Sequence, residues 1–219
     1  MEESNSVDHL NSSLTDLMTS LMVIFILLLL VFVHRTAGKD AAVTDVLLRK
    51  LRQDMSPQGF SENTIRPDPR DRNAILVIVP DRLMNFERNK STLKPEGQTF
   101  LKKYVPQLAG VLCSNQFRSS VESIVIEGHT DTQPFAGHTA EESNDLNLKL
   151  SQDRSMEVVK NALADLSSVD ENRGCFLEKL SATGRGEQEQ EATPEESRRV
   201  IFKIRVKVVD TDSIKVAVH

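Results

Sequence analysis

One uninterrupted apolar stretch constrains this chain more than any other feature. Residues 14–33 read LTDLMTSLMVIFILLLLVFV, and no charged side chain occurs between positions 17 and 33. An α-helix rises about 1.5 Å per residue, so this stretch spans roughly 30 Å, the hydrocarbon thickness of one bilayer. The pattern predicts a transmembrane helix at residues 14–33, preceded by a short tail at residues 1–13.

The flanks of the stretch favour an uncleaved anchor over a cleaved signal peptide. A signal peptide begins with basic residues and ends at a small-residue cleavage site. The segment before the span contains acidic residues and no Lys or Arg, and the segment after it offers only a weak cleavage site. Arg35 and Lys39 follow the span, so the positive-inside bias taken alone would leave the C-terminal part in the cytoplasm.

Asp16 lies near the N-terminal end of the apolar stretch. At 100° per residue, Ser12, Ser13, Thr19 and Ser20 fall within about 60° of it, so the polar groups form one stripe. A carboxylate near hydrocarbon normally faces protein or water and marks an ion path. Alternatively, Asp16 is a helix N-terminal residue in the headgroup layer, where it complements the helix dipole. Position alone leaves both interpretations open.

The string D-L-M-T-S-L-M at residues 16–22 resembles the start of the transmembrane helix in the family of the flagellar stator protein MotB. That family shares Asp-x-Met-Thr-x-x-Met, and Asp16, Met18, Thr19 and Met22 match it. The Asp carries the ion there, so the resemblance implies that Asp16 and Thr19 lie on a path for H+ or Na+. It implies no bound cofactor or metal.

Residues 34–73 are predicted to be a juxtamembrane helix followed by a linker. Val43, Val46, Leu47 and Leu51 repeat with helical spacing. In stator proteins the corresponding region can plug the ion channel, whereas a stalk or dimer-contact helix would show the same pattern. Three prolines and few apolar residues then predict an extended linker up to residue 73.

Residues 74–209 are predicted to form one α+β domain, and residues 210–219 a C-terminal tail. Apolar runs predict strands at residues 74–79, 123–127, 177–182 and 200–209. Helical periodicity predicts helices at residues 91–112 and 147–166. The resulting order is β-α-β-α-β-β.

Three short strings within this domain resemble the motifs of the OmpA-like peptidoglycan-binding domain. They are G-H-T-D at residues 128–131, N-L-K-L-S-Q-D-R at residues 147–154 and R-R-V at residues 198–200. Each string alone is weak, but three in order on the matching elements form a specific signal. Ser155 and Ser197 depart from the family pattern, which prefers Ala and Asn there, and the loop between residues 131 and 147 is long and acidic.

The resemblance implies that Asp131 and Arg154 bind diaminopimelate of the peptidoglycan stem peptide. A carboxylate can take the ammonium of a zwitterion while a guanidinium takes its carboxylate. A structural salt bridge between the two is the alternative. On the helix at residues 147–166, the apolar sector that includes Leu148 and Met156 is expected to pack on the sheet. The remaining candidate binding residues are Thr130, Thr132, Asn147 and Arg199.

Together the two resemblances imply a non-enzymatic B subunit of a stator-like complex. Such subunits form a homodimer inside a ring of MotA/ZorA-like multi-span subunits, with the N-terminus in the cytoplasm and the wall domain in the periplasm. The short acidic N-terminal tail resembles that of ZorB subunits from Zorya anti-phage defence systems. A flagellar stator subunit and a passive cell-wall tether are the alternatives.

The inner membrane is therefore the expected location, and an exported domain would let Cys113 and Cys175 form a disulfide. Both cysteines are expected just after helices that end at the same edge of the sheet. The net charge of −5 gives no sign of nucleic-acid binding.

Overall fold

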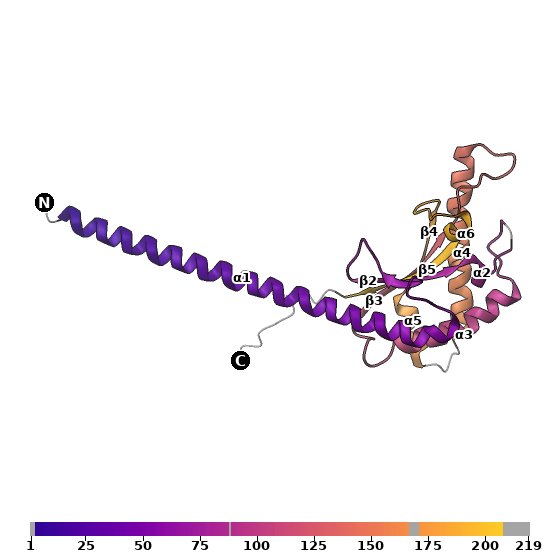
Figure 1. Cartoon of the computed structure of the whole chain (residues 1–219), viewed down its shortest axis with the longest axis horizontal. Coiled ribbons are helices and arrows are strands. Elements are labelled where there is room, and N and C mark those ends of the chain that lie inside the picture. The colour runs from indigo at the N-terminus through magenta and orange to yellow at the C-terminus, as the bar shows by residue number, and fades with distance from the viewer. Residues whose placement is uncertain (1–2, 88, 167–170, 208–219) are drawn as a thin grey trace. The chain divides into compact units, whose positions relative to one another are not determined.

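The computed structural model describes residues 3–87, 89–166 and 171–207, which Figure 1 draws as ribbons. The chain divides into two units, and the boundary between them follows Ala41. The predicted C-terminal tail at residues 210–219 lies outside the described residues.

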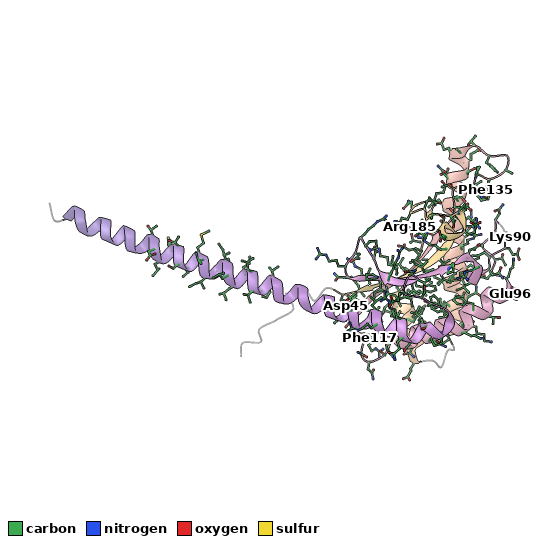
Figure 2. All side chains as sticks on the ribbon, in the orientation of Figure 1. Asp45, Lys90, Glu96, Phe117, Phe135 and Arg185 are labelled. Carbon is green, nitrogen blue, oxygen red and sulfur yellow. A yellow bond between two sulfur atoms is a disulfide. The ribbon has the colours of Figure 1, made fainter. Side chains whose placement is uncertain are left out.

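The first unit contains most of helix α1, which spans Glu3–Met55. Within it, Thr15–Val33 is a 19-residue segment of mean hydropathy 2.7, long and apolar enough to cross a membrane. Its side chains are exposed all around the helix, as Figure 2 shows. This segment agrees with the predicted span at residues 14–33 to within one residue.

The second unit begins at Ala42, so the predicted start of the folded domain at residue 74 is too late. Leu47, Leu51 and Met55 at the end of α1 are fully buried and belong to the hydrophobic core of this unit. The predicted juxtamembrane helix therefore exists, but its apolar face is covered by its own domain. A channel plug or a dimer contact made by this face would need the face to be exposed, whereas here it is buried.

The predicted linker also differs from the structure. Residues 56–73 contain a 3-10 turn at Ser56–Gln58 and strand β1 at Ile65–Pro67, which pairs antiparallel with the next strand. Phe60 is buried and its ring lies 5.3 Å from that of Tyr104. Sparse apolar residues within a polar, proline-rich segment are thus enough to fix it to the core.

The sheet of the second unit has five strands in the order β1-β2-β5-β3-β4. After β1 come β2 at Ala74–Pro80, β3 at Val121–His129, β4 at Leu180–Gly186 and β5 at Arg199–Val206. All neighbouring strands are antiparallel except β3 and β4, which are parallel. The predicted β-α-β-α-β-β order is confirmed, with β1 as an additional edge strand.

Helices pack on one face of this sheet. They are α2 at Asp81–Met84, α3 at Pro95–Leu112, α4 at Ala140–Asp165 and α5 at Glu171–Lys179, while the short α6 at Pro194–Ser197 lies between β4 and β5 in the chain. Side chains of β5 alternate across the sheet, so Val200, Phe202 and Ile204 enter the core beneath α3. We call the opposite face, which carries Lys203 and Arg205, the outer face.

Helix α4 starts seven residues before its predicted start at residue 147. Thr139 and Glu142 form a capping box, in which the Thr139 hydroxyl accepts from the Glu142 amide and the Glu142 carboxylate accepts from the Thr139 amide. The two reciprocal bonds satisfy amides that would otherwise lack partners at the helix N-terminus. The cap lies in the acidic segment that was predicted to be a loop.

The prediction that the apolar sector of α4 packs on the sheet is wrong for its first part, although Val159 and Leu166 further along do join the core. Leu148 and Met156 are each 46% exposed, and small or polar residues face the strands instead. The reason is close backbone approach: a Cβ added at Gly128 would lie 2.1 Å from the Ser151 carbonyl oxygen. The Ser151 hydroxyl is satisfied within the protein, because it donates to the Leu148 carbonyl at 2.7 Å and accepts from the Gly186 amide at 2.9 Å.

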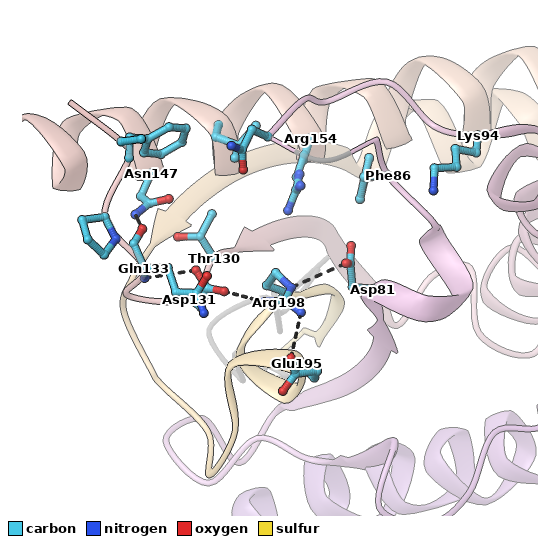
Figure 3. A pocket seen from close by; sticks show the side chains of 15 residues that line it. Asp81, Phe86, Lys94, Thr130, Asp131, Gln133, Asn147, Arg154, Glu195 and Arg198 are labelled. Carbon is cyan, nitrogen blue, oxygen red and sulfur yellow. Dashed lines mark hydrogen bonds and ion pairs between the residues drawn. The ribbon is translucent and has the colours of Figure 1, made fainter. Parts of the chain in front are cut away.

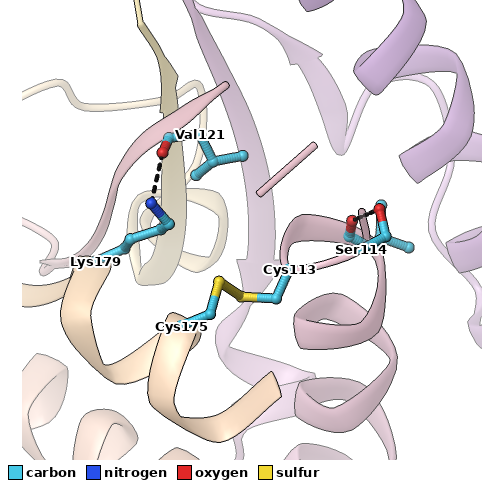
Figure 4. Close-up of a disulfide and its surroundings, with 6 residues drawn as sticks. Cys113, Ser114, Val121, Cys175 and Lys179 are labelled. Atoms are coloured by element: carbon cyan, nitrogen blue, oxygen red, sulfur yellow. Dashed lines mark hydrogen bonds between the residues drawn. A yellow bond between two sulfur atoms is a disulfide. The ribbon is translucent and has the colours of Figure 1, made fainter. Parts of the chain in front are cut away.

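Cys113 and Cys175 form a disulfide with a Cα–Cα distance of 6.0 Å (Figure 4). Cys113 follows α3, as predicted, whereas Cys175 lies inside α5, where no helix was predicted. Lys179 at the end of α5 donates to the Val121 carbonyl at 2.9 Å. The disulfide and this bond tie α5 to α3 and to the start of β3.

Candidate functional site

A pocket of about 520 Å³ lies where β3 ends, beside α4 and the loop between α2 and α3 (Figure 3). The G-H-T-D string ends in this pocket, and the R-R-V string enters it from the other side. Its wall combines charged groups with apolar ones. The lining residues are Asp81, Phe86, Asn89, Lys94, Thr130, Asp131, Gln133, Pro134, Phe135, Ala136, Asn147, Leu150, Arg154, Glu195 and Arg198.

Asp131 is 8% exposed, and its partner in the pocket is Arg198, whose Nη1 lies 2.5 Å from Asp131 Oδ2. Arg198 also contacts Glu195 at 3.2 Å and Asp81 at 3.7 Å. Burial alone would lower the pKa of Arg198, but hydrogen bonding to Asp131 and the neighbouring carboxylates outweigh burial and raise it. Arg198 is thus a permanently charged residue held by three carboxylates.

Arg154 enters the same pocket from α4 and is 6% exposed. Its Nε donates to the Lys90 carbonyl at 3.1 Å, and its Cζ lies 4.8 Å from the centroid of the Phe86 ring. Within the described part of the chain it forms no ion pair. Burial lowers the pKa of Arg154, an effect that Asp81 and Asp131 partly offset and Arg198 reinforces.

Asp131 and Arg154 therefore share one pocket without pairing to each other. This arrangement does not match the structural salt bridge that was the alternative interpretation of the two residues. Asp131 instead orients its own loop, because its Oδ1 accepts from the Gln133 amide at 3.2 Å. The guanidinium of Arg154 remains available to an anion from outside.

Thr130 and Asn147 also line the pocket, as expected of binding residues. Thr130 is fixed by its amide, which donates to the Gly186 carbonyl at 2.9 Å. Asn147 donates from Nδ2 to Glu187 at 2.8 Å. Both residues are buried; the Thr130 bond joins the end of β3 to the end of β4, and the Asn147 bond joins α4 to the residue after β4.

Thr132 and Arg199 do not line the pocket. Thr132 is exposed, and Arg199 lies on the outer face, at a second pocket of about 290 Å³. Arg199 donates there to the Glu189 carbonyl at 2.7 Å and lies 3.5 Å from the Glu191 carboxylate. Adjacent residues entering a strand point to opposite faces, so only Arg198 of the R-R pair can reach the first pocket. That alternation was the available signal for Arg198.

Asp16 and Thr19 belong to the first unit, where both are exposed on α1. Thr19 donates from its hydroxyl to the Thr15 carbonyl one turn earlier. Ser20 is exposed as well, whereas the side chains of Ser12 and Ser13 lie outside the described ones. The ion-carrying roles of Asp16 and Thr19 stay predictions.

The pocket presents charges of both signs to a ligand. Its acidic groups gather around Arg198, and its buried, unpaired cation is Arg154. No group of three or more His, Cys, Asp or Glu side chains that could hold a metal ion occurs among the described residues. An ammonium and a carboxylate on one ligand would find opposite charges within one cavity.

Comparison with known proteins gives a family and a whole-length relative. The model of the OmpA family matches residues 85–203, more than half of the chain and a range that contains Asp131 and Arg154. The Zorya protein ZorB of Escherichia coli is 22% identical over 206 residues, covering 88% of this chain and 86% of that protein.

Solved structures show the same fold. A MotB-like protein from Desulfovibrio vulgaris has a TM-score of 0.55 at 20% identity, covering 78% of this chain and 95% of that one. The periplasmic domain of Helicobacter pylori MotB has a TM-score of 0.50 at 15% identity, covering 68% of this chain and 92% of that one. At these identities the likeness concerns the fold alone.

Proposed function

Because this chain belongs to the OmpA family, we propose that its second unit binds the peptidoglycan stem peptide through the pocket of Asp131 and Arg154. The observation that carries this proposal is the buried guanidinium of Arg154, which lacks an ion-pair partner among the described residues. A buried charge without a partner is costly, and a ligand carboxylate would compensate it. Diaminopimelate supplies that carboxylate together with an ammonium for the acidic groups.

We further propose that the chain is the wall-anchored B subunit of an ion-driven inner-membrane complex of the MotB kind. Asp16, at the start of a 19-residue apolar segment, then relays protons or sodium ions. Two copies would pass through a ring of MotA/ZorA-like multi-span subunits. The N-terminus would face the cytoplasm and the second unit would hold the complex to the wall in the periplasm.

Within that class, a role in Zorya anti-phage defence is favoured over a flagellar role. The similarity to ZorB extends over most of both chains, well beyond the residues that match the OmpA family. A flagellar stator subunit and a passive tether are the competing functions. Genes for a helicase or nuclease beside a MotA-like gene would favour defence, and a flagellar gene cluster would favour a flagellar stator subunit.

Sedimentation with purified peptidoglycan tests the binding site. Arg154→Ala should bind the wall roughly ten- to hundredfold more weakly, since a hydrogen bond to a charged group contributes about 1.5–3 kcal/mol. Arg154→Lys should recover only part of the loss, because Lys cannot make the bidentate contact. Arg118→Ala, which removes an exposed arginine outside the pocket, is the matched control. Equal binding by all variants with unchanged thermal unfolding would rule out the assigned site.

Substitution of Asp16 separates a motor from a tether. Asp16→Asn keeps the size of the side chain but removes its charge, so ion flow and the biological activity of the complex should be lost. Membrane insertion and wall sedimentation should persist, and Asp16→Glu should retain part of the activity. An Asn variant as active as the wild type would leave only the passive tether.

A further inference from the structure

Charge is divided unevenly between the two sides of the pocket. On one side, the carboxylates of Asp81, Asp131 and Glu195 converge on the single guanidinium of Arg198. Three negative charges and one positive charge leave this group with a formal net charge of −2, from −3 + 1. We call these four residues the acidic side of the pocket.

On the other side, two cations line the pocket next to an aromatic ring. Arg154 lies over Phe86, and Figure 3 shows Lys94 beyond Phe86, extending in the same direction as Arg154. Neither cation has a carboxylate within ion-pair distance among the described residues, so this basic side has a net charge of +2. Lys94 directly precedes α3, and its amide donates to the Asn85 carbonyl at 3.0 Å, which fixes its backbone.

One ligand carboxylate would satisfy only half of the basic side. A carboxylate that binds the guanidinium of Arg154 in bidentate fashion uses both of its oxygens there. Lys94 is a compact charge with three donors on a flexible stem, suited to a separate anionic group nearby. The acidic side meanwhile has two charges in excess of Arg198 and can take an ammonium.

We propose that Lys94 is a specificity-determining residue that binds a second carboxylate of the ligand. The pocket then selects peptides that carry two free carboxylates beside an ammonium over peptides in which one of those carboxylates is amidated. This inference rests on the proposed binding of the stem peptide and deepens it. It adds a residue that lies outside the G-H-T-D, N-x-x-L-S-x-x-R and R-R-V strings.

The experiment titrates the full-length chain in detergent with a tripeptide that ends in meso-diaminopimelate, and with each mono-amidated form of that peptide. Lys94→Gln should bind the fully free acid about tenfold more weakly than the wild type does, the effect of losing one charge-assisted contact. For one mono-amide, Lys94→Gln and wild type should bind equally, because the carboxylate that Lys94 contacts is already absent. Lys94 is exposed, so its substitution leaves the core unchanged.

Lys103→Gln is the matched control, since it removes the same charge from α3, the helix that Lys94 precedes. Lys103 is exposed and does not line the pocket. Its variant should bind every peptide as the wild type does. An equal loss in both lysine variants would replace the direct contact with a long-range charge effect and overturn the proposal.

Further outcomes would show whether only the role of Lys94 fails or the proposed stem-peptide binding fails as well. If Arg154→Ala loses binding of the free acid while Lys94→Gln does not, the proposed function stands and the inference about Lys94 fails. If the wild type binds none of the peptides, the proposed stem-peptide binding fails and this inference falls with it. A constant loss for Lys94→Gln across the free acid and all mono-amides also refutes a second-carboxylate contact.

Discussion

Individual ion pairs hold the outer face of the sheet, on the side away from the helices. Lys203 Nζ lies 2.6 Å from Asp68 Oδ2, and Arg205 Nε lies 3.3 Å from Asp71 Oδ2. Asp68 is 7% exposed and also accepts from the Arg70 amide at 2.9 Å. These contacts join β5 to the segment after β1, the part of the chain predicted to be a linker.

Asp68→Asn should destabilise the second unit in a pH-dependent way. Burial would raise the pKa of Asp68, but the hydrogen bonds from Lys203 and the Arg70 amide, with their charges, outweigh burial and lower it below 3.8. The ionised form therefore stabilises the fold fully above about pH 4, and this stabilisation is lost as the pH falls through the lowered pKa. At pH 7 the variant should lose about 1–3 kcal/mol of unfolding free energy.

Urea denaturation of the full chain in detergent at pH 7 and pH 3 measures this difference. The difference in unfolding free energy between wild type and Asp68→Asn should be smaller at pH 3 than at pH 7. Glu62→Gln is the control, because the Glu62 side chain is 83% exposed and its ion pair with Arg52 is weak at 3.6 Å. A gap of the same size at both pH values would contradict the role assigned to the ionised carboxylate.

At the scale of elements, α4 packs through its smallest side chains. Ser151 and Ser155 are fully buried, while Met156 is 46% exposed. A Cβ added at Gly184 would lie 2.6 Å from both the Gln152 amide nitrogen and the Ser151 hydroxyl, so helix and strand meet backbone to backbone. The Ser155 hydroxyl is satisfied locally, since it donates to the Gln152 carbonyl at 2.8 Å.

Two neighbouring positions on α4 should therefore differ in how strongly substitution changes the free energy of unfolding. Ser155→Leu should lower the unfolding free energy by about 1–3 kcal/mol or more, because the added carbons must displace the sheet. Met156→Ser should change it by about 0.5 kcal/mol or less, as expected of an exposed position. Chemical denaturation of both variants measures the difference. A larger cost at Met156 than at Ser155 would contradict this packing.

The sequence predicted the positions of the helices and strands better than it predicted which side of each one is buried. Runs such as residues 74–79 are apolar throughout, so β2 and the order of the main strands followed from composition and period. Burial of Ser151 and exposure of Met156 depend instead on the glycines of neighbouring strands, which no pattern within α4 reveals. Asp131 and Arg154 could be found from motifs, and Arg198 from the alternation of side chains along a strand, whereas Lys94 required the folded pocket.

At the scale of the whole molecule, the chain combines an apolar segment that has a carboxylate near its N-terminal end with a domain that has a charged pocket. The basic residues after the span predict that the domain stays in the cytoplasm, and the proposed ligand requires it to be in the periplasm. The disulfide between Cys113 and Cys175 agrees with an oxidising compartment. The side of the membrane on which the domain lies therefore decides whether the proposed ion path and the proposed wall anchor can belong to one subunit.

Labelling of an introduced cysteine in whole cells tests this orientation most directly. Both natural cysteines are paired, and the Lys149 side chain on α4 is 71% exposed, so Lys149→Cys offers one accessible thiol. After permeabilisation of the outer membrane alone, a membrane-impermeant maleimide should label this variant, while a cytoplasmic thiol protein in the same cells stays unlabelled. Labelling of Lys149→Cys only after the inner membrane is opened would place the domain in the cytoplasm and contradict a wall-anchored subunit.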